Sequence, residues 1–166
     1  KDQHLAESSI HQQKTQAQQY DFAQVVRLAK VWARLVKAER EGFRLKSFMI
    51  ELILARLCNQ GLDFSDYPEA LQHFFTYVAK SSMREKIVFT DYYAASAVGV
   101  FTEPVQIIDP VNEKNNVSRL YSTAQADSIV DAALVAGDAI DAALSATTKE
   151  KTAYYWQKVF GVSFQG

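Results

Sequence analysis

The sequence predicts a mainly α-helical bundle with room for one short strand pair. Five stretches repeat their apolar residues with the spacing of a helix that buries one face. Only two short segments, KIVFTDYY and PVQIID at 104–109, have strand character. No linker long enough to divide the chain lies between these stretches. A chain of 166 residues with 48% apolar content can bury one hydrophobic core.

A polar, Gln-rich lead-in spans residues 1–20, and the first strong helix is predicted over residues 22–40. Asp21 is expected to cap this helix and Gly42 to end it. The core face carries Phe22, Val25, Val26, Ala29, Trp32, Ala33 and Val36, widened by Leu28, Val31 and Leu35. The edge that remains, a sector of about 80°, carries four cations. These are Arg27, Lys30, Arg34 and Lys37.

The second helix is predicted over residues 48–59, with Ser47 as its cap and Asn59 and Gly61 at its end. It is apolar nearly all round, which places it at the centre of the bundle. Glu51 is the exception, and we expect a nearby Arg or Lys to pair with it.

The third helix is predicted over residues 68–80, started by Asp66 and Pro68. Its inward residues are Leu71, Phe74, Phe75 and Val78. The two strand-like segments follow this helix, and Asp109-Pro110 is expected to end the second of them. The tract DPVNEKNN is expected to be a polar turn.

The helical pattern returns from about residue 117 in an Ala-rich stretch, where DAAL occurs at 131–134 and again at 141–144. The run from Thr147 to Glu150 predicts a capping box for a last helix over residues 148–160. Tyr155, Trp156, Val159 and Phe160 are expected to dock it. Gly161 ends it, so the helical domain spans residues 21–161 and a flexible tail covers residues 162–166.

The charge pattern excludes some classes of function. A net charge of −1 argues against a protein coated by nucleic acid. The charge is uneven, because residues 1–60 hold ten Lys/Arg against six Asp/Glu, whereas residues 121–145 hold four Asp and no cation. A charged patch on one side is therefore compatible with the near-neutral total.

Cysteine and histidine indicate no redox or metal site. Cys58 is the single cysteine, so no disulfide forms within the chain and a reducing cytosol fits. His4, His11 and His73 are scattered without a zinc pattern. No apolar segment reaches the ~18 residues of a membrane span. No phosphate-binding GxxxxGK[ST] loop, GxGxxG motif or closely spaced acidic pair is present. The residues alone indicate a binding domain without a catalytic centre.

Two stretches carry a resemblance to a known family. RLAKVWARL, followed after a short polar gap by KSFMIELI, resembles the C-terminal helical half of the oligoadenylate synthetase and cyclic GMP-AMP synthase superfamily. The later VQIIDPVNEKNNV is similar to the strand, Asp-Pro turn and Asn segment of that family. The pattern covers roughly residues 20–160, and the bacterial cGAS/DncV-like nucleotidyltransferases (CD-NTases) of CBASS anti-phage operons fit best.

The resemblance implies a domain that contacts the donor nucleotide during synthesis of a cyclic di- or oligonucleotide. It assigns Lys30 to the nucleotide phosphates, Ser47 to the same nucleotide and Phe48 to base stacking. Phe48 stands where the family commonly has Tyr, so it keeps the stacking face without the hydroxyl. Asp109, Asn115 and Asn116 are expected to shape a turn, with a role at the cleft edge as the alternative.

The family's catalytic half, with a Gly-Ser loop and three acidic residues that hold two Mg²⁺, has no counterpart in this sequence. The resemblance implies Mg²⁺ with ATP or GTP in the complete enzyme and none bound by this chain alone, which is predicted to be inactive by itself. Implied partners are an N-terminal catalytic half and CBASS operon proteins, including an E1/E2-like protein that would conjugate Gly166. The alternatives are a stand-alone helical interaction module and an RNA-binding helical domain that uses the edge from Arg27 to Lys37.

Overall fold

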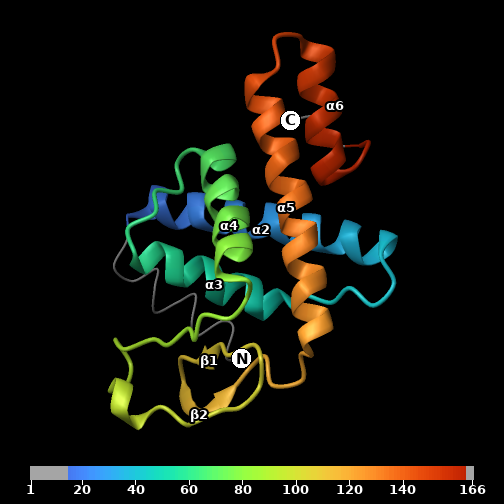
Figure 1. Cartoon of the computed structure of the whole chain (residues 1–166). Coiled ribbons are helices and arrows are strands. Elements are labelled where there is room, and N and C mark those ends of the chain that lie inside the picture. The colour runs from blue at the N-terminus through green and yellow to red at the C-terminus, as the bar shows by residue number, and fades with distance from the viewer. Residues whose placement is uncertain (1–14, 164–166) are drawn as a thin grey trace.

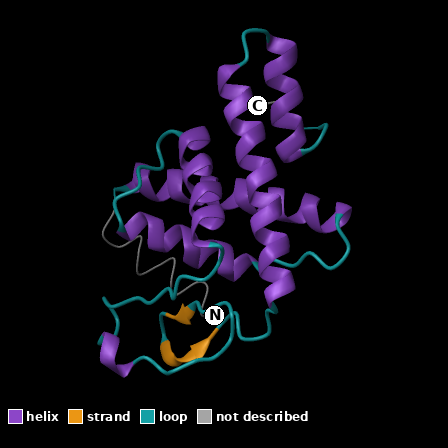
Figure 2. Ribbon diagram, viewed as in Figure 1, coloured by secondary structure: helices purple, strands orange, loops and turns teal. Residues whose placement is uncertain are grey.

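The computed structural model describes residues 15–163, which form five α-helices and one short antiparallel strand pair (Figures 1 and 2). The predicted mainly α fold is confirmed. In chain order the elements are α2 (Gln16–Glu39), α3 (Ser47–Asn59), α4 (Tyr67–Ser81), the 3₁₀ turn η1 (Ala95–Ala97), β1 (Ile108–Asp109), β2 (Asn112–Asn116), α5 (Thr123–Ser145) and α6 (Lys149–Phe160). The strand pair lies at one end of the bundle, near the start of α5, and the turn that joins α5 to the antiparallel α6 lies at the other end (Figure 1).

Helix α2 begins earlier than predicted. Thr15 is its N-cap and forms a capping box with Gln18, so the cap at Asp21 and the start at residue 22 were wrong. The physical reason is local: a Thr followed three residues later by Gln satisfies two backbone N–H groups, and the Gln-rich residues that follow are good helix formers. Asp21 instead accepts a hydrogen bond of 2.8 Å from the Tyr67 hydroxyl, which ties α2 to α4.

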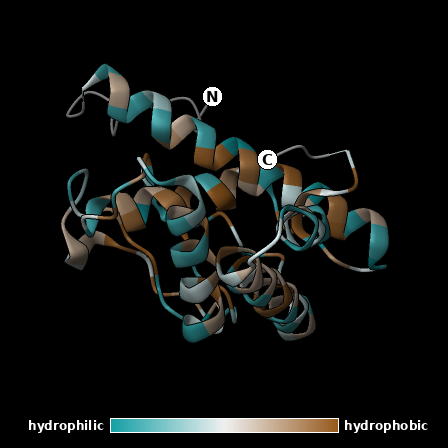
Figure 3. Ribbon diagram, turned by 90° about the horizontal axis from the view of Figure 1, so that it is seen from above, coloured by the Kyte–Doolittle hydropathy of each residue, from teal (hydrophilic) through white to brown (hydrophobic). Residues whose placement is uncertain are grey.

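The predicted core face of α2 is confirmed for six of its seven residues. Phe22, Val25, Val26, Ala29, Trp32 and Ala33 are buried, and Val36 is half-buried. Trp32 packs edge-on against the rings of Phe43, Phe74 and Phe75, with the centroid of Phe75 4.7 Å away. In the view from above, hydrophobic and hydrophilic residues alternate along the ribbon of α2, as expected for a helix with one apolar face (Figure 3). Burial of these large rings makes α2 a rigid support for the side chains on its edge.

Helices α3 and α4 follow the prediction closely. Eight of the 13 residues of α3 are buried, which gives it the central position expected from its composition. Asp66 caps α4 by accepting from the Glu69 N–H, and Pro68 lies in its first turn. Leu71, Phe74, Phe75 and Val78 all point into the core.

The strand pair is a hairpin that the sequence did not predict correctly. β1 and β2 pair antiparallel, so the tract read as a polar turn contains a strand, NEKNN. KIVFTDYY contributes only a single parallel bridge between Ile87 and Ile107. The reason is that backbone pairing across the Asp109-Pro110 turn needs no apolar side chains on β2, in which only Asn116 is buried.

Asn116 holds this hairpin to the preceding loop. Its side-chain oxygen accepts from the backbone N–H groups of Ile107 and Ser118, both at 3.0 Å, and from the Ser118 hydroxyl. Its amide nitrogen donates to the carbonyl oxygen of Val105 and to Glu103. Only 1% of Asn116 is exposed. The whole hydrogen-bonding capacity of this side chain is therefore used inside the fold.

Asn116→Ala is expected to destabilise the chain by about 2–3 kcal/mol, because it leaves buried backbone groups without partners. Asn112→Ala is the matched control: Asn112 is exposed and accepts only from Lys114 N–H, so its loss should cost under about 1 kcal/mol. Urea unfolding of the two variants measures the difference. Equal losses of unfolding free energy in the two variants would mean that the buried amide of Asn116 stabilises the fold no more than the exposed side chain of Asn112 does.

The C-terminal helices α5 and α6 have well-defined N-caps, and α5 packs mainly through short side chains. Ser122 and Gln125 form a capping box at the start of α5, whose buried face is made of Ala and Ile. Thr148, not Thr147, caps α6 by accepting from Lys151 N–H, so the predicted capping box of Thr147 with Glu150 was wrong. Val159 and Phe160 are buried as expected, and Tyr155 and Trp156 are half-buried. Gly161 ends α6 with a φ of 90°.

No helix within residues 15–163 is long and apolar enough to cross a bilayer. Gly166, His4 and His11 lie outside the described residues.

Candidate functional site

The four cations of α2 are not equivalent. The Nζ atom of Lys30 lies 3.1 Å from Oε1 of Glu51 on α3, and the two side chains are 22% and 2% exposed. Arg27, Arg34 and Lys37 are exposed, and Arg27 donates to Gln24 on its own helix. The expected cationic partner for Glu51 is therefore confirmed as Lys30. The pair singles out Lys30 as the one cation of the stripe that the α2–α3 contact holds in place.

Ser47 is the first residue of α3 and is exposed. The prediction that it caps the helix was wrong, because the N-cap is Lys46, whose side chain makes no cap hydrogen bond. The chain enters the helix one residue earlier than the polar side chain suggested. As the first helical residue, Ser47 presents its hydroxyl beside backbone N–H groups that have no acceptor within the helix.

Phe48 is half-buried and packs against the hydrophobic core. Part of the side chain therefore contributes to packing, and the rest is accessible to solvent. Packing against the core is thus observed for Phe48, and base stacking stays a prediction.

The fold brings Lys30 to the same face of α3 as Ser47. Glu51 lies four residues after Ser47, and residues so spaced are neighbours on a helix surface. Because Lys30 contacts Glu51, its ammonium lies about one helical turn from Ser47. Lys30 and the exposed Ser47 therefore lie on one face of α3 at its N-terminal end, where a helix favours an anion.

Three further cations near this end of α3 were missed by the sequence reasoning. The backbone N–H of Lys46 donates to the Tyr121 hydroxyl at 3.1 Å, and the guanidinium of Arg44 lies 5.4 Å from the centre of the Tyr121 ring. Burial, followed by the charges of Arg44 and Arg119, lowers the pKa of Lys46. Arg44 and Lys46 stand together in the sequence, but Arg119 is 73 residues away from Lys46, so only the fold could reveal this group.

Asp109 and Asn115 shape the hairpin turn, as expected. The Oδ1 atom of Asp109 accepts from Val111 N–H at 2.9 Å, and its Oδ2 accepts from Asn115 Nδ2 at 3.3 Å. Asp109 is 2% exposed. Within residues 15–163, the hydrogen bonds of Asp109, Asn115 and Asn116 stay inside the hairpin and its adjacent loop and do not reach Lys30 or Ser47. Their role at a cleft edge stays a prediction.

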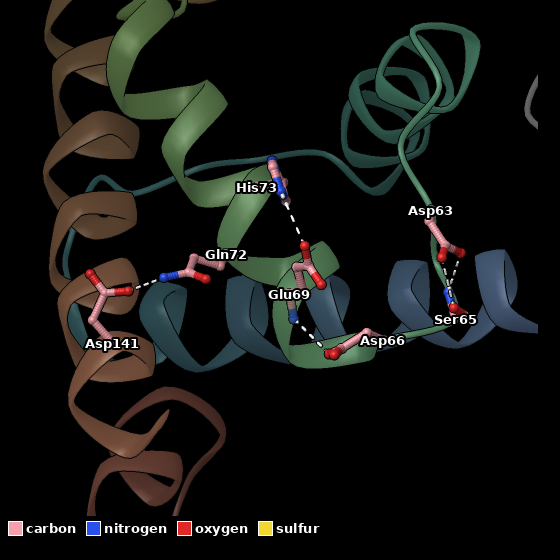
Figure 4. A network of polar contacts seen from close by, with 7 residues as sticks. All are labelled: Asp63, Ser65, Asp66, Glu69, Gln72, His73 and Asp141. Atoms are coloured by element: carbon pink, nitrogen blue, oxygen red, sulfur yellow. Dashed lines mark hydrogen bonds and ion pairs between the residues drawn. The ribbon is translucent and has the colours of Figure 1, made fainter. Parts of the chain in front are cut away.

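The opposite end of α3 carries polar contacts and hollows of another kind. Two hollows of about 400 and 520 Å³ border the loop after α3, and Asp63 lines both. Neither is lined by Lys30, Ser47 or Phe48. Figure 4 shows the polar contacts nearby: Asp63 accepts from Ser65, Glu69 pairs with His73, and Gln72 on α4 donates to Asp141 on α5. These contacts order a loop and join two helices.

Cys58 borders the larger hollow and is half-buried. Among residues 15–163, no group of three or more His, Cys, Asp or Glu side chains could hold a metal ion.

Comparisons with known proteins add to this geometry. No family model matches the chain. The chain is 65% identical over 145 residues to the cyclic AMP-AMP-AMP synthase of Escherichia coli strain MS 115-1, an alignment that covers 87% of this chain and 45% of the relative. It is 31% identical over 145 residues to the CBASS oligonucleotide cyclase CdnC of Escherichia coli strain KTE188, covering 87% of this chain and 42% of that protein.

Two solved structures have the same fold. They are E. coli MS115-1 CdnC with ATP and the complex of that CdnC with HORMA-deltaN. Each superposes on this chain with a TM-score of 0.90 at 59% identity, over 96% of this chain and 49% of the other. The chain spans less than half the length of the curated relatives it matches.

Proposed function

We propose that this chain, which belongs to the CBASS CD-NTases and corresponds to the C-terminal helical part of such an enzyme, contacts the donor nucleotide during synthesis of a cyclic oligonucleotide second messenger. One observation carries the proposal. The Lys30 ammonium pairs with Glu51 on α3, one helical turn after Ser47, the first residue of that helix.

Lys30 contributes a positioned charge. An ammonium group has three N–H donors, and the contact with Glu51 occupies one direction. The side chain is 22% exposed, so its remaining donors can reach a phosphate from the solvent side. Glu51 keeps the long, flexible side chain in one place before the nucleotide arrives, which lowers the entropy lost on binding.

Ser47 and Phe48 complete the contact. The Ser47 hydroxyl and the free N–H groups of the first turn of α3 would donate hydrogen bonds to an anionic oxygen of the nucleotide. The solvent-accessible part of Phe48 would offer a stacking surface for the base, a contact that contributes about 1–3 kcal/mol in comparable sites. Phosphate and base would then be held by adjacent residues of one rigid helix.

Residues 15–163 do not fit the metal ions of the reaction, because they contain no suitable cluster of ligands. No step of the proposed function runs through a metal held by residues 15–163. In the proposal, two Mg²⁺ and the acidic residues that bind them belong to a catalytic half that pairs with this domain.

The names of the relatives guide the choice of ligand and partner. The 65% identical relative is a cyclic AMP-AMP-AMP synthase, and a solved relative was studied with ATP. ATP is therefore the first nucleotide that we propose for this domain. A HORMA protein is the first protein partner that we propose, because the solved relative was also studied in complex with HORMA-deltaN.

Calorimetric titration of the chain with ATP and with adenosine tests the proposal. ATP is expected to bind at least about tenfold more tightly, because only ATP brings oxygens for charge-assisted hydrogen bonds to Lys30 and α3. The titration needs no Mg²⁺ and no catalysis. Equal affinity for ATP and adenosine, or no binding of either, would count against a phosphate contact in this domain.

A further inference from the structure

The larger hollow, of about 520 Å³, lies between the first turns of α2 and the loop that follows α3. Helix α2 contributes Asp21 and Phe22 to its lining, and the loop contributes Asp63 and Phe64. The rings of Phe22 and Phe64 stack with their centroids 5.1 Å apart and their planes 6° apart, which fixes the loop against α2. The hollow therefore has a defined shape, and its volume is within the range of sites for small molecules.

The lining of this hollow is negatively charged. Asp21 and Asp63 are its two carboxyl groups, and no described Lys or Arg lines it. Among the described residues, neither carboxylate forms an ion pair. Arg27, whose charge acts on the neighbouring Tyr67, is not part of the lining. The two carboxylates thus leave a negative potential that a cationic ligand would complement.

Hydrogen bonds hold both carboxylates in place. Oδ1 of Asp21 accepts from the Tyr67 hydroxyl at 2.8 Å. The two oxygens of Asp63 accept from the backbone N–H and the hydroxyl of Ser65, each at 2.9 Å (Figure 4). These bonds from Ser65 lower the pKa of Asp63, which keeps the group ionised at neutral pH. An ionised carboxylate offers about four lone-pair positions, so each Asp can accept further hydrogen bonds from a ligand.

The rest of the lining favours an organic cation. Ala17 is exposed in it, and Leu62 and Cys58 are half-buried, so carbon and sulfur surface borders the carboxylates. Within the described part of the chain, no group of three or more ligands could hold a metal ion. An aliphatic chain that ends in an ammonium group matches such a lining, because its carbon stem contacts apolar surface while its charged end reaches an acceptor.

The adjoining hollow, of about 400 Å³, extends this surface. It shares Gly61, Leu62 and Asp63 with the larger one and adds Glu69, which pairs with His73 at 3.9 Å. A third carboxylate therefore lies beyond Asp63, beside the same stretch of loop. A ligand that carries several ammonium groups along one carbon chain suits carboxylates arranged in this way.

We propose that the larger hollow binds an aliphatic ammonium ligand, with its charged groups on Asp21 and Asp63 and its carbon chain on the apolar lining. Two sources share this chemistry: a free polyamine and the lysine side chain of another protein. The site lies at the opposite end of α3 from Ser47 and uses neither Lys30 nor Phe48. It is therefore independent of the proposed nucleotide contact.

Calorimetric titration of the chain with spermidine at low ionic strength tests the proposal. Asp21→Asn and Asp63→Asn each keep one accepting oxygen and remove the charge. Each is expected to weaken spermidine binding by at least about fivefold, because charge-assisted hydrogen bonds become neutral ones. Asp138→Asn is the matched control, since Asp138 is an exposed carboxylate of α5 outside the hollow. It should leave the affinity within about twofold.

Cys58 gives a second readout, because it is the single cysteine of the chain and lines the hollow. Alkylation of its thiol with N-ethylmaleimide fills part of the hollow and should weaken spermidine binding by at least about fivefold. Mass spectrometry establishes that the thiol is modified, and circular dichroism that the fold is retained. Unchanged binding after alkylation, or equal losses from Asp138→Asn and Asp63→Asn, would place the amine elsewhere on the acidic surface and overturn the proposal.

Titration with N-acetyl-lysine amide separates the two sources of the ligand. Tighter binding of spermidine identifies a free polyamine, whereas tighter binding of the lysine amide identifies a side chain of a partner protein. Either result supports the site when Asp21→Asn and Asp63→Asn weaken the binding. If neither compound binds, the proposal is wrong, and the ATP titrations that test Lys30 are unaffected.

Discussion

Lys30→Met is expected to weaken ATP binding by about 10- to 100-fold, which corresponds to the loss of one hydrogen bond to a charged group. Methionine keeps the apolar stem and removes only the ammonium. The same loss should appear in the rate of oligonucleotide synthesis when the domain is joined to a catalytic half. Calorimetry on the chain and product analysis on the longer enzyme give the two measurements.

Lys37→Met is the matched control for this prediction. Lys37 belongs to the same stripe, carries the same charge and is exposed near the end of α2, away from Glu51. Its replacement should leave ATP binding within about twofold, since an exposed charge contributes little at physiological salt. Equal losses from the two variants would mean that the stripe acts as one general patch, and the specific assignment of Lys30 would be wrong.

Lys30→Met is also expected to destabilise the fold by about 2–4 kcal/mol, because it removes the ammonium that faces a buried carboxylate. The cost should fall toward the lower end of that range, since Lys30 keeps 22% exposure and water reaches the pair. Urea unfolding of the chain measures it.

The companion variant Lys30→Met with Glu51→Leu removes both charges. It should recover most of the lost stability, because a buried ion pair replaced by apolar side chains of similar size is often as stable as the original. A double variant as unstable as Lys30→Met would show that the buried charge of Glu51 is not the source of the cost.

The helices and their buried faces could be predicted because they depend on local spacing. The six buried residues of α2 and the five of α4 recur at helical intervals, and burial of one face follows from that pattern alone. The ends were less predictable. Thr15, Lys46 and Thr148 are the caps, whereas Asp21, Ser47 and Thr147 were as good or better candidates by residue type.

The strand pair and the basic group around Tyr121 depend on contacts that no local pattern contains. β2 is polar and pairs through its backbone, so its side chains carry little strand signal. Arg119 comes close to Lys46 only because the chain from β2 to α5 passes the start of α3. The Lys30–Glu51 pair could be predicted in part. A lone carboxylate on an apolar helix predicts a cation nearby, but the choice among four cations required the packing of α2 on α3.

The ATP affinity of the Lys30→Met, Glu51→Leu double variant tests the central claim most directly, because it separates nucleotide binding from the stability of the pair. If Lys30 contacts phosphate, the double variant should unfold within about 1 kcal/mol of the original chain and still bind ATP at least about tenfold more weakly. If the double variant binds ATP as tightly as the original chain, Lys30 serves only to neutralise Glu51, and the proposed donor contact is contradicted.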